Sequence, residues 1–159
     1  MKKFYVGFLL CLFAGQVAQA QEPTVSAGQL IRFNNFPSSY IPSREVDVWL
    51  PPGYNENKRY PVLYLHDGQM LFDAANTWNK QGWEIDDTIQ ALLQQQLIEP
   101  MLVVGIHNTG ATRHAEYCPQ RPFENLPKPY RDSLLASLRE VHPVGYFAST
   151  IQSDAYLRF

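Results

Sequence analysis

Hydrophobic and polar side chains alternate between Arg44 and Leu50, where Val46, Val48 and Leu50 occupy every second position. A period of two residues is typical of a strand that buries one face. A shorter strand is predicted at Leu30–Phe33. The first third of the chain therefore predicts two short strands before any helix.

Two later segments, Pro61–Leu65 and Met101–Ile106, are apolar without interruption. Such runs are typical of strands that are covered on both faces. A helix is predicted between them, because apolar residues recur with a 3.6-residue period and acidic residues occupy its first turn. Its apolar stripe is Ile85, Ile89, Leu92, Leu93 and Leu97. Strand, helix and strand with short connections predict a βαβ unit with parallel strands and a right-handed crossover.

The rest of the chain predicts two more helices, one over Arg131–Val141 and one that opens at Ser153. Alternating strands and helices favour an α/β fold with an open sheet. Ligands bind such sheets at the carboxyl ends of the strands. The loops at 66–82 and 107–129 are therefore the places to look for a functional site.

Composition places the chain among globular proteins. It has 159 residues, 45% of them hydrophobic and 18% charged, with a formal net charge of −2. This is too apolar for an intrinsically disordered chain. The absence of a positive excess argues against nucleic acid as a partner.

The first twenty residues have the pattern of a secretory signal peptide. Lys2 and Lys3 precede an apolar run at 4–14, and Ala18-Gln19-Ala20 has the small-x-small form of a cleavage site. The run is too short to cross a bilayer, so no membrane anchor is expected. We expect export to the periplasm or the medium with cleavage after Ala20. Residues 21–28 are then a flexible lead-in, and 29–159 form the folded part.

Several motifs, taken in order, resemble a known family. They are Val46-Asp47-Val48-Trp49-Leu50-Pro51-Pro52-Gly53-Tyr54, His66-Asp67-Gly68-Gln69-Met70-Leu71-Phe72-Asp73, Trp83-Glu84-Ile85-Asp86, Val103-Val104-Gly105-Ile106-His107-Asn108, and Arg113 with Glu116-Tyr117. Together they look like the N-terminal part of an esterase of the α/β-hydrolase superfamily, in the family of esterase D, feruloyl and enterochelin esterases. The resemblance implies a mostly parallel sheet with an antiparallel N-terminal edge.

The resemblance also implies a serine esterase that acts on a small-molecule carboxylic ester without a cofactor or metal. One oxyanion-hole N–H in that fold comes from the loop after the third strand. The backbone N–H of Gln69 is the expected donor, with Gly68 or Met70 as alternatives. The expected substrate-binding residues are His66, Asp67, Gly68, Arg113, Glu116 and Tyr117.

Two residue pairs leave alternatives open. His66 and Asp67 could act as a dyad or hold a metal, but neighbouring residues of an extended chain point in opposite directions, which argues against a shared metal. Arg113 and Glu116 are expected to pair within their loop, either over the pocket or as a solvated surface pair.

The sequence departs from the family pattern at the nucleophile, which lies on a G-x-S-x-G elbow. No two of the nine glycines are four residues apart, and Ser149 follows Gly145 without a second glycine. We therefore expect a fragment truncated before the elbow, inactive by itself. The alternative is a non-catalytic remnant or binding fragment of the fold. In either case, an unpaired sheet edge is expected beside Met101–Ile106.

Overall fold

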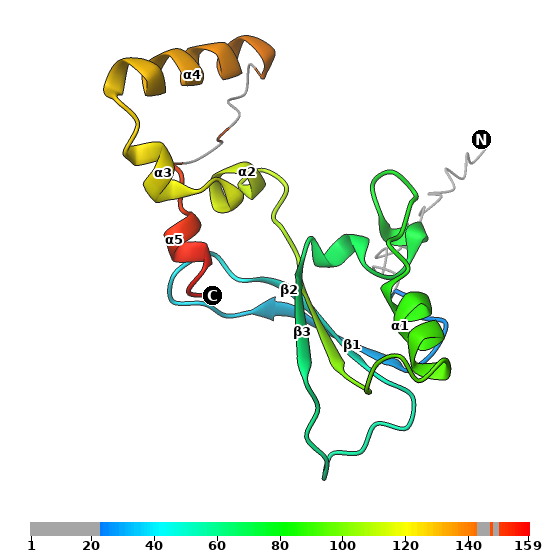
Figure 1. Ribbon diagram of the computed structural model, residues 1–159. Helices are drawn as coiled ribbons and strands as arrows, with labels where there is room; N and C mark the ends of the chain where they lie inside the picture. Colours follow the sequence, from blue (N-terminus) through cyan, green and yellow to red (C-terminus); the bar gives the residue numbers. More distant parts are fainter. Residues whose placement is uncertain (1–22, 143–146, 148–149) are drawn as a thin grey trace, which may run out of the picture.

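The computed structural model describes residues 23–142, 147 and 150–159 (Figure 1). The predicted signal peptide and Ser149 lie outside these residues. The strands are β1 (Gln29–Phe36), β2 (Arg44–Leu50), β3 (Val62–His66) and β4 (Leu102–Ile106). The helices are η1 (Gly68–Met70), η2 (Ala74–Asn76), α1 (Ile85–Gln94), α2 (Arg113–Tyr117), α3 (Gln120–Glu124), α4 (Lys128–Val141) and α5 (Ser153–Tyr156).

The four strands form one sheet in the order β1-β2-β4-β3. β1 and β2 are antiparallel, β2 and β4 are antiparallel, and β3 and β4 are parallel from the pair Val62–Leu102 to the pair His66–Ile106. The predicted parallel pairing around the α1 crossover and the antiparallel N-terminal edge are both confirmed. The resemblance implied a mostly parallel sheet, but the described part of the sheet is mostly antiparallel, with this one parallel pair.

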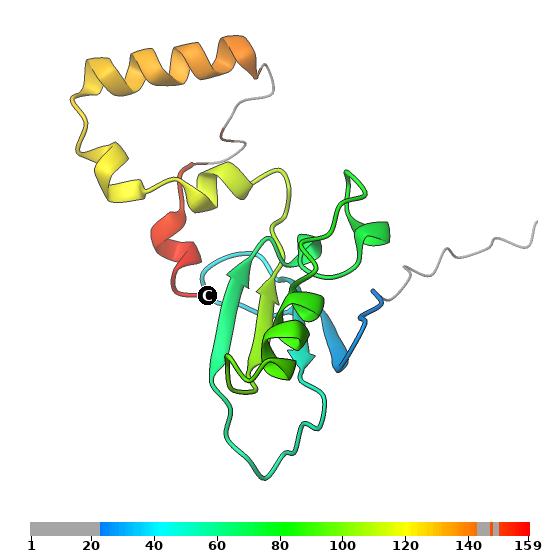
Figure 2. The same cartoon turned by 45° about the vertical axis from the view of Figure 1, so that its right-hand side comes forward.

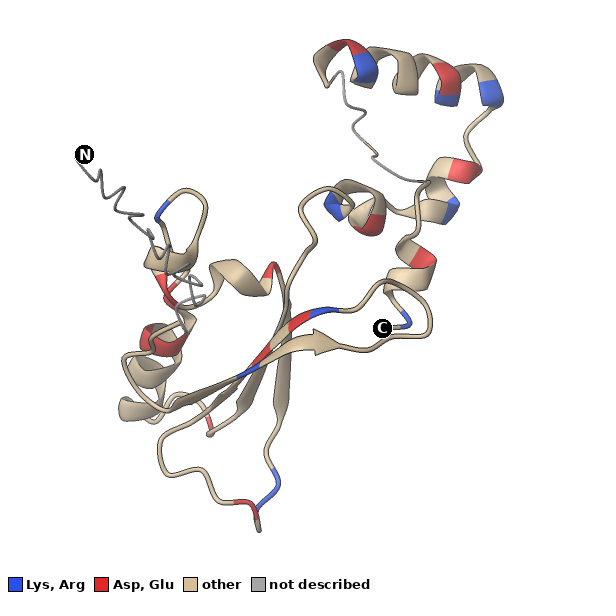
Figure 3. Cartoon of the chain, turned by 180° about the vertical axis from the view of Figure 1, so that it is seen from behind, with Lys and Arg blue, Asp and Glu red and all other residues tan. Residues whose placement is uncertain are grey.

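Helix α1 lies against one face of the sheet (Figure 2), and the core includes side chains from this helix and from the sheet. The core consists of Trp49, Leu71, Phe72, Ile89 and Val103. Acidic and basic positions follow one another along β2 (Figure 3), yet Asp47 and Trp49 are the most buried of its side chains. Val46 and Leu50 are buried as the alternating pattern predicts. However, Asp47 and Trp49 on the opposite face are buried as well, so β2 is covered on both faces rather than one.

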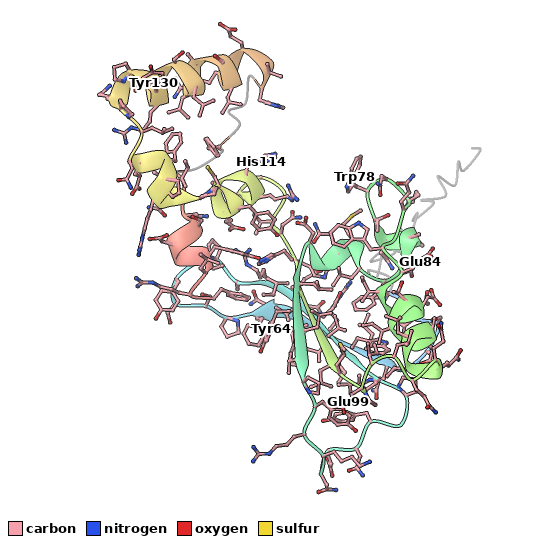
Figure 4. The ribbon with its side chains drawn as sticks, viewed as in Figure 1. Tyr64, Trp78, Glu84, Glu99, His114 and Tyr130 are labelled. Carbon is pink, nitrogen blue, oxygen red and sulfur yellow. The ribbon has the colours of Figure 1, made fainter. Side chains whose placement is uncertain are left out.

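β4 is an inner strand of the sheet, not an edge. Among the described residues β4 has a neighbour on each side, and the two edge strands are β1 and β3. Tyr64, labelled beside β3 in Figure 4, is 67% exposed, so this strand is not covered on both faces. The sequence predicted a β3 strand covered on both faces and an open edge at β4. Both expectations are wrong for the described chain, because strand order is not encoded in local hydrophobicity.

Helix α1 ends earlier than its apolar stripe predicts. Gln96 has a left-handed backbone with φ 56°. Its N–H donates to the Leu93 carbonyl, and the Leu97 N–H donates to the Leu92 carbonyl. This is the Schellman arrangement that usually has glycine at the left-handed position. Leu97 therefore lies outside the helix, and it is 64% exposed.

The segment after β4, expected to be a loop up to residue 129, contains α2 and α3. The elements α2–α5 lie beyond the carboxyl ends of β3 and β4, and α4 stands away from the sheet (Figure 1). The two later helices predicted from the sequence are confirmed as α4 and α5. Among the described residues, no helix is long and apolar enough to span a bilayer.

The segment that precedes β1, predicted from the sequence as a flexible lead-in, makes several hydrogen bonds over the described residues 23–28. The N–H and hydroxyl of Thr24 both donate to Asp73, each at 3.0 Å. The N–H and hydroxyl of Ser26 donate to Asp86 at 2.7 and 3.0 Å. The Trp49 indole donates to the Ala27 carbonyl at 2.8 Å. These bonds hold the N-terminal segment against α1 and the loop before η2.

Candidate active site

A cleft of about 460 Å³ lies at the carboxyl ends of β3 and β4, between the segments that follow these two strands. One wall comes from the segment after β3, where Trp78 lies at the tip of a loop (Figure 4). The other wall comes from the segment after β4. The lining residues are Asp67, Gln69, Met70, Trp78, Trp83, Asn108, Gly110 and Arg113. This is the location expected for a ligand site in an open α/β sheet.

The backbone turns sharply where β3 ends. Asp67 has a left-handed conformation with φ 56° and ψ 44°, and the short helix η1 begins at the next residue. Aspartate tolerates this conformation better than most residues. Gly68 packs against the β4 backbone so closely that a Cβ atom there would lie 2.6 Å from the Gly105 carbonyl carbon. Glycine is therefore required at this position for steric reasons.

The N–H of Gln69 lies in the first turn of η1, where helical N–H groups have no acceptor within the helix. Met70 donates to the Asp67 carbonyl at 2.8 Å, but the Gln69 N–H makes no hydrogen bond within the described part of the chain. The Gln69 side chain is fixed separately, because its Oε1 accepts the Asn108 N–H at 3.2 Å. The loop thus presents a backbone donor at a lining residue of the cleft.

The Asp67 carboxylate is surrounded by donors of its own chain. Arg113 donates from Nε at 2.9 Å and from Nη2 at 2.6 Å, one bond to each carboxylate oxygen. Asn108 Nδ2 donates at 2.7 Å and the Tyr117 hydroxyl at 3.0 Å. The carboxylate therefore joins the loop after β3 to α2 and to the loop after β4.

These contacts shift the protonation of Asp67. Burial raises the pKa of its carboxyl, but the hydrogen bonds from Arg113, Asn108 and Tyr117 outweigh burial and hold the pKa below its ordinary value. Since the folded pKa is lower than the unfolded one, ionised Asp67 stabilises the fold above the unfolded pKa of about 3.9. This stabilisation is lost as the pH falls through the folded pKa.

We therefore expect the free energy of unfolding to fall more steeply between about pH 5 and pH 2 in the wild type than in an Asp67→Asn variant, because asparagine does not titrate. Urea unfolding at several pH values measures both curves. Parallel curves for the two proteins would show that Asp67 is not held ionised by these contacts.

Glu116 does not pair with Arg113, contrary to the sequence expectation. It is 1% exposed and does not line the cleft. Its two carboxylate oxygens accept from Arg44 Nη1 and Nη2 at 2.9 and 2.8 Å. The three residues Arg113, Glu116 and Tyr117 share one face of α2, because they are three and four positions apart. Two ion pairs hold that face of α2 in place. In one, α2 supplies the cation Arg113 to Asp67, and in the other it supplies the anion Glu116 to Arg44.

His66 and Asp67 point to different partners. His66 Nδ1 lies 2.7 Å from the Tyr156 hydroxyl, and its ring packs against the rings of Tyr117 and Tyr156. Burial, followed by its polar neighbours, raises the pKa of Tyr117, which keeps its hydroxyl protonated and able to donate to Asp67. In the part of the chain that the structure describes, no group of three His, Cys, Asp or Glu side chains could hold a metal ion.

His107 is a structural residue of the site that sequence reasoning missed. Its ring is buried, with Nε2 2.8 Å from Asp47 and Nδ1 3.1 Å from Glu45. Arg32 donates two bonds to Asp47, each at 2.7 Å. A Cβ atom on Gly68 would lie 2.6 Å from the His107 ring, so this ring supports the turn before Gln69. The sequence did offer one signal for this cluster, because an aspartate between two valines in a strand indicates a buried carboxylate that needs a partner.

A family model agrees with the sequence resemblance, and several solved structures are similar to part of the chain. A family model described as Putative esterase matches residues 39–138. A mutant of the feruloyl esterase module from Clostridium thermocellum, complexed with sinapinate, is 19% identical with a TM-score of 0.43 and covers 84% of this chain and 42% of its own. A ferulic acid esterase from Anaeromyces mucronatus, in complex with ferulic acid, is 19% identical with a TM-score of 0.41 and covers 77% and 46%. The chain spans less than half the length of these structures.

Proposed function

We propose that this chain, which belongs to the Putative esterase family, supplies one oxyanion-hole donor of a carboxylic-ester hydrolase. The donor is the backbone N–H of Gln69. It would bind the carbonyl oxygen of the ester while a serine attacks the carbonyl carbon. Negative charge develops on that oxygen during the attack, and a fixed donor in a partly dry site stabilises it.

The observation that carries this proposal is the state of the Gln69 N–H. It follows the parallel strand β3, occupies the first turn of η1, has no acceptor within the described chain and belongs to a lining residue of the cleft. The oxyanion-hole donor of α/β-hydrolases comes from the loop at this place in the fold. The Asn108 N–H donates to the Gln69 side chain, which helps to fix the residue whose backbone N–H is the proposed donor.

The remaining catalytic groups are proposed to lie in sequence beyond the 159 residues. No G-x-S-x-G motif is present in these residues, and in this fold the nucleophile precedes the acid and the histidine along the chain. The serine would attack with the histidine as general base, and the histidine would pass that proton to the alcohol as the ester C–O bond breaks. Water would then hydrolyse the acyl-enzyme to the carboxylic acid and the free serine. Lys2, Lys3 and the Ala18-Gln19-Ala20 pattern support export of this hydrolase with cleavage after Ala20, which N-terminal sequencing of the exported protein tests.

The decisive experiment compares the 159-residue chain with a version extended along its reading frame. We expect the extended protein to hydrolyse p-nitrophenyl acetate and to be labelled and inhibited by a fluorophosphonate at a serine within a G-x-S-x-G motif. The 159-residue chain is expected to show no turnover above buffer, because it lacks that serine. A stop codon directly after Phe159, with a soluble and inactive product, would instead support a non-catalytic remnant of the fold.

A further inference from the structure

We propose that Arg113 is a positioning and charge-compensating residue, which keeps the Asp67 carboxylate from opposing the oxyanion bound at Gln69. This inference rests on the proposed function, because it concerns the charge that forms during ester hydrolysis. It assigns Asp67 and Arg113 to the support of the oxyanion loop rather than to direct contact with the substrate.

The two residues are the charged side chains among those that line the cleft in the described structure. Asp67 lies two positions before Gln69 and lines the same cleft, so its full negative charge belongs to the same site as the proposed oxyanion donor. A like charge near a developing negative charge raises the barrier, and the effect is largest where water is excluded. The negative charge of Asp67 must therefore be balanced by a positive charge if the Gln69 N–H is to stabilise the oxyanion.

Arg113 provides that compensation in a fixed geometry. Its Nε and Nη2 each donate to a different oxygen of Asp67, and its guanidinium lies 4.9 Å from the centre of the Tyr117 ring. A planar guanidinium matches a carboxylate with two parallel bonds, which a lysine ammonium does not reproduce. The charge of Asp67 is thus balanced within the pair, before any substrate enters.

The carboxylate is retained because it organises the turn. It accepts from α2 through Arg113 and Tyr117 and from the loop after β4 through Asn108, while its own residue adopts the left-handed conformation that starts η1. A neutral residue would remove the repulsion but also part of this network. Asp67 therefore fixes the loop, and Arg113 cancels the charge of Asp67.

The test measures kcat and KM for p-nitrophenyl acetate in the extended protein with three variants. Arg113→Gln leaves Asp67 ionised without its counter-charge, and kcat is expected to fall about 10- to 100-fold while KM changes little. Asp67→Asn combined with Arg113→Gln removes both charges, and kcat is expected to recover about tenfold relative to Arg113→Gln alone. Arg121→Gln is the matched control, because Arg121 pairs with Asp154 outside the cleft with 80% of its side chain exposed.

A second measurement separates charge from folding. The Asp67 side chain is 10% exposed beneath Arg113, and shortening the arginine gives ions access to it. Raising the salt concentration is therefore expected to increase kcat of Arg113→Gln modestly and to leave the wild type unchanged. A double variant no faster than Arg113→Gln, in an active wild-type background, would overturn this inference and leave the proposed function intact. An extended wild type without turnover would overturn the proposed function, and this inference with it.

Discussion

Replacing Gly68 with alanine is expected to lower the free energy of unfolding by at least about 3 kcal/mol, the upper range for overpacking. The new Cβ would lie 2.6 Å from the Gly105 carbonyl carbon, 2.7 Å from its oxygen and 2.6 Å from the His107 ring. Two of these atoms belong to the backbone of the central strand β4, so they cannot rotate away. The turn that carries Gln69 would have to separate from the sheet.

Gly53→Ala is the control for this prediction. Gly53 has φ +73° and no atom within 4 Å of its would-be Cβ, so alanine there meets only backbone strain of about 1 kcal/mol. Urea unfolding followed by tryptophan fluorescence measures both variants. Equal losses of stability for the two variants would show that Gly68 is not tightly packed between β4 and His107.

Removing the Glu116 carboxylate is expected to have the largest effect among the ion pairs of the fold. The side chains of Arg44 and Glu116 are 1% and 0% exposed. Removing one member of a buried pair leaves the other charge uncompensated, which costs about 3–5 kcal/mol. Arg44 also stacks near the rings of Tyr156 and Phe159, so Glu116→Ala would loosen the contacts among β2, α2 and α5.

Two further variants make this prediction specific. Asp132→Ala breaks the exposed pair between Lys128 and Asp132 on α4, and no measurable change of stability is expected. Arg44→Met combined with Glu116→Leu replaces both buried charges with apolar groups and is expected to recover most of the loss. A free energy of unfolding for Glu116→Ala within about 1 kcal/mol of the wild-type value would show that this ion pair does not hold α2 against β2.

The sequence predicts well those features that depend on neighbouring residues. The strand Arg44–Leu50, the helix that starts at Ile85 and the turn after β3 follow from periodicity, acidic residues in a first turn and a short motif. The end of α1 was missed because Gln96, not glycine, takes the left-handed position. The burial of β3 was misjudged because an apolar run does not reveal whether its strand lies inside the sheet or at the edge.

In the candidate site too, features set by neighbouring residues were predicted and features set by distant residues were not. The motif identified Gln69 as the expected donor, and that role remains a prediction. The partners of Asp67 were not predictable from the sequence, because Arg113 and Tyr117 are 46 and 50 positions away. The expected pair of Arg113 with Glu116 was wrong for a related reason, since closeness along α2 does not decide which side chains of other elements each residue meets.

The central claim is that the Gln69 N–H holds the oxyanion, and a crystal structure of the extended protein with a phosphonate bound to its serine tests it most directly. The phosphonate oxygen stands in for the oxyanion of the tetrahedral intermediate. We expect this oxygen about 2.7–3.1 Å from the Gln69 nitrogen, which is the range for an oxyanion-hole donor. An adduct whose oxygen is bound by other donors, with the Gln69 nitrogen beyond about 4 Å, would contradict the claim.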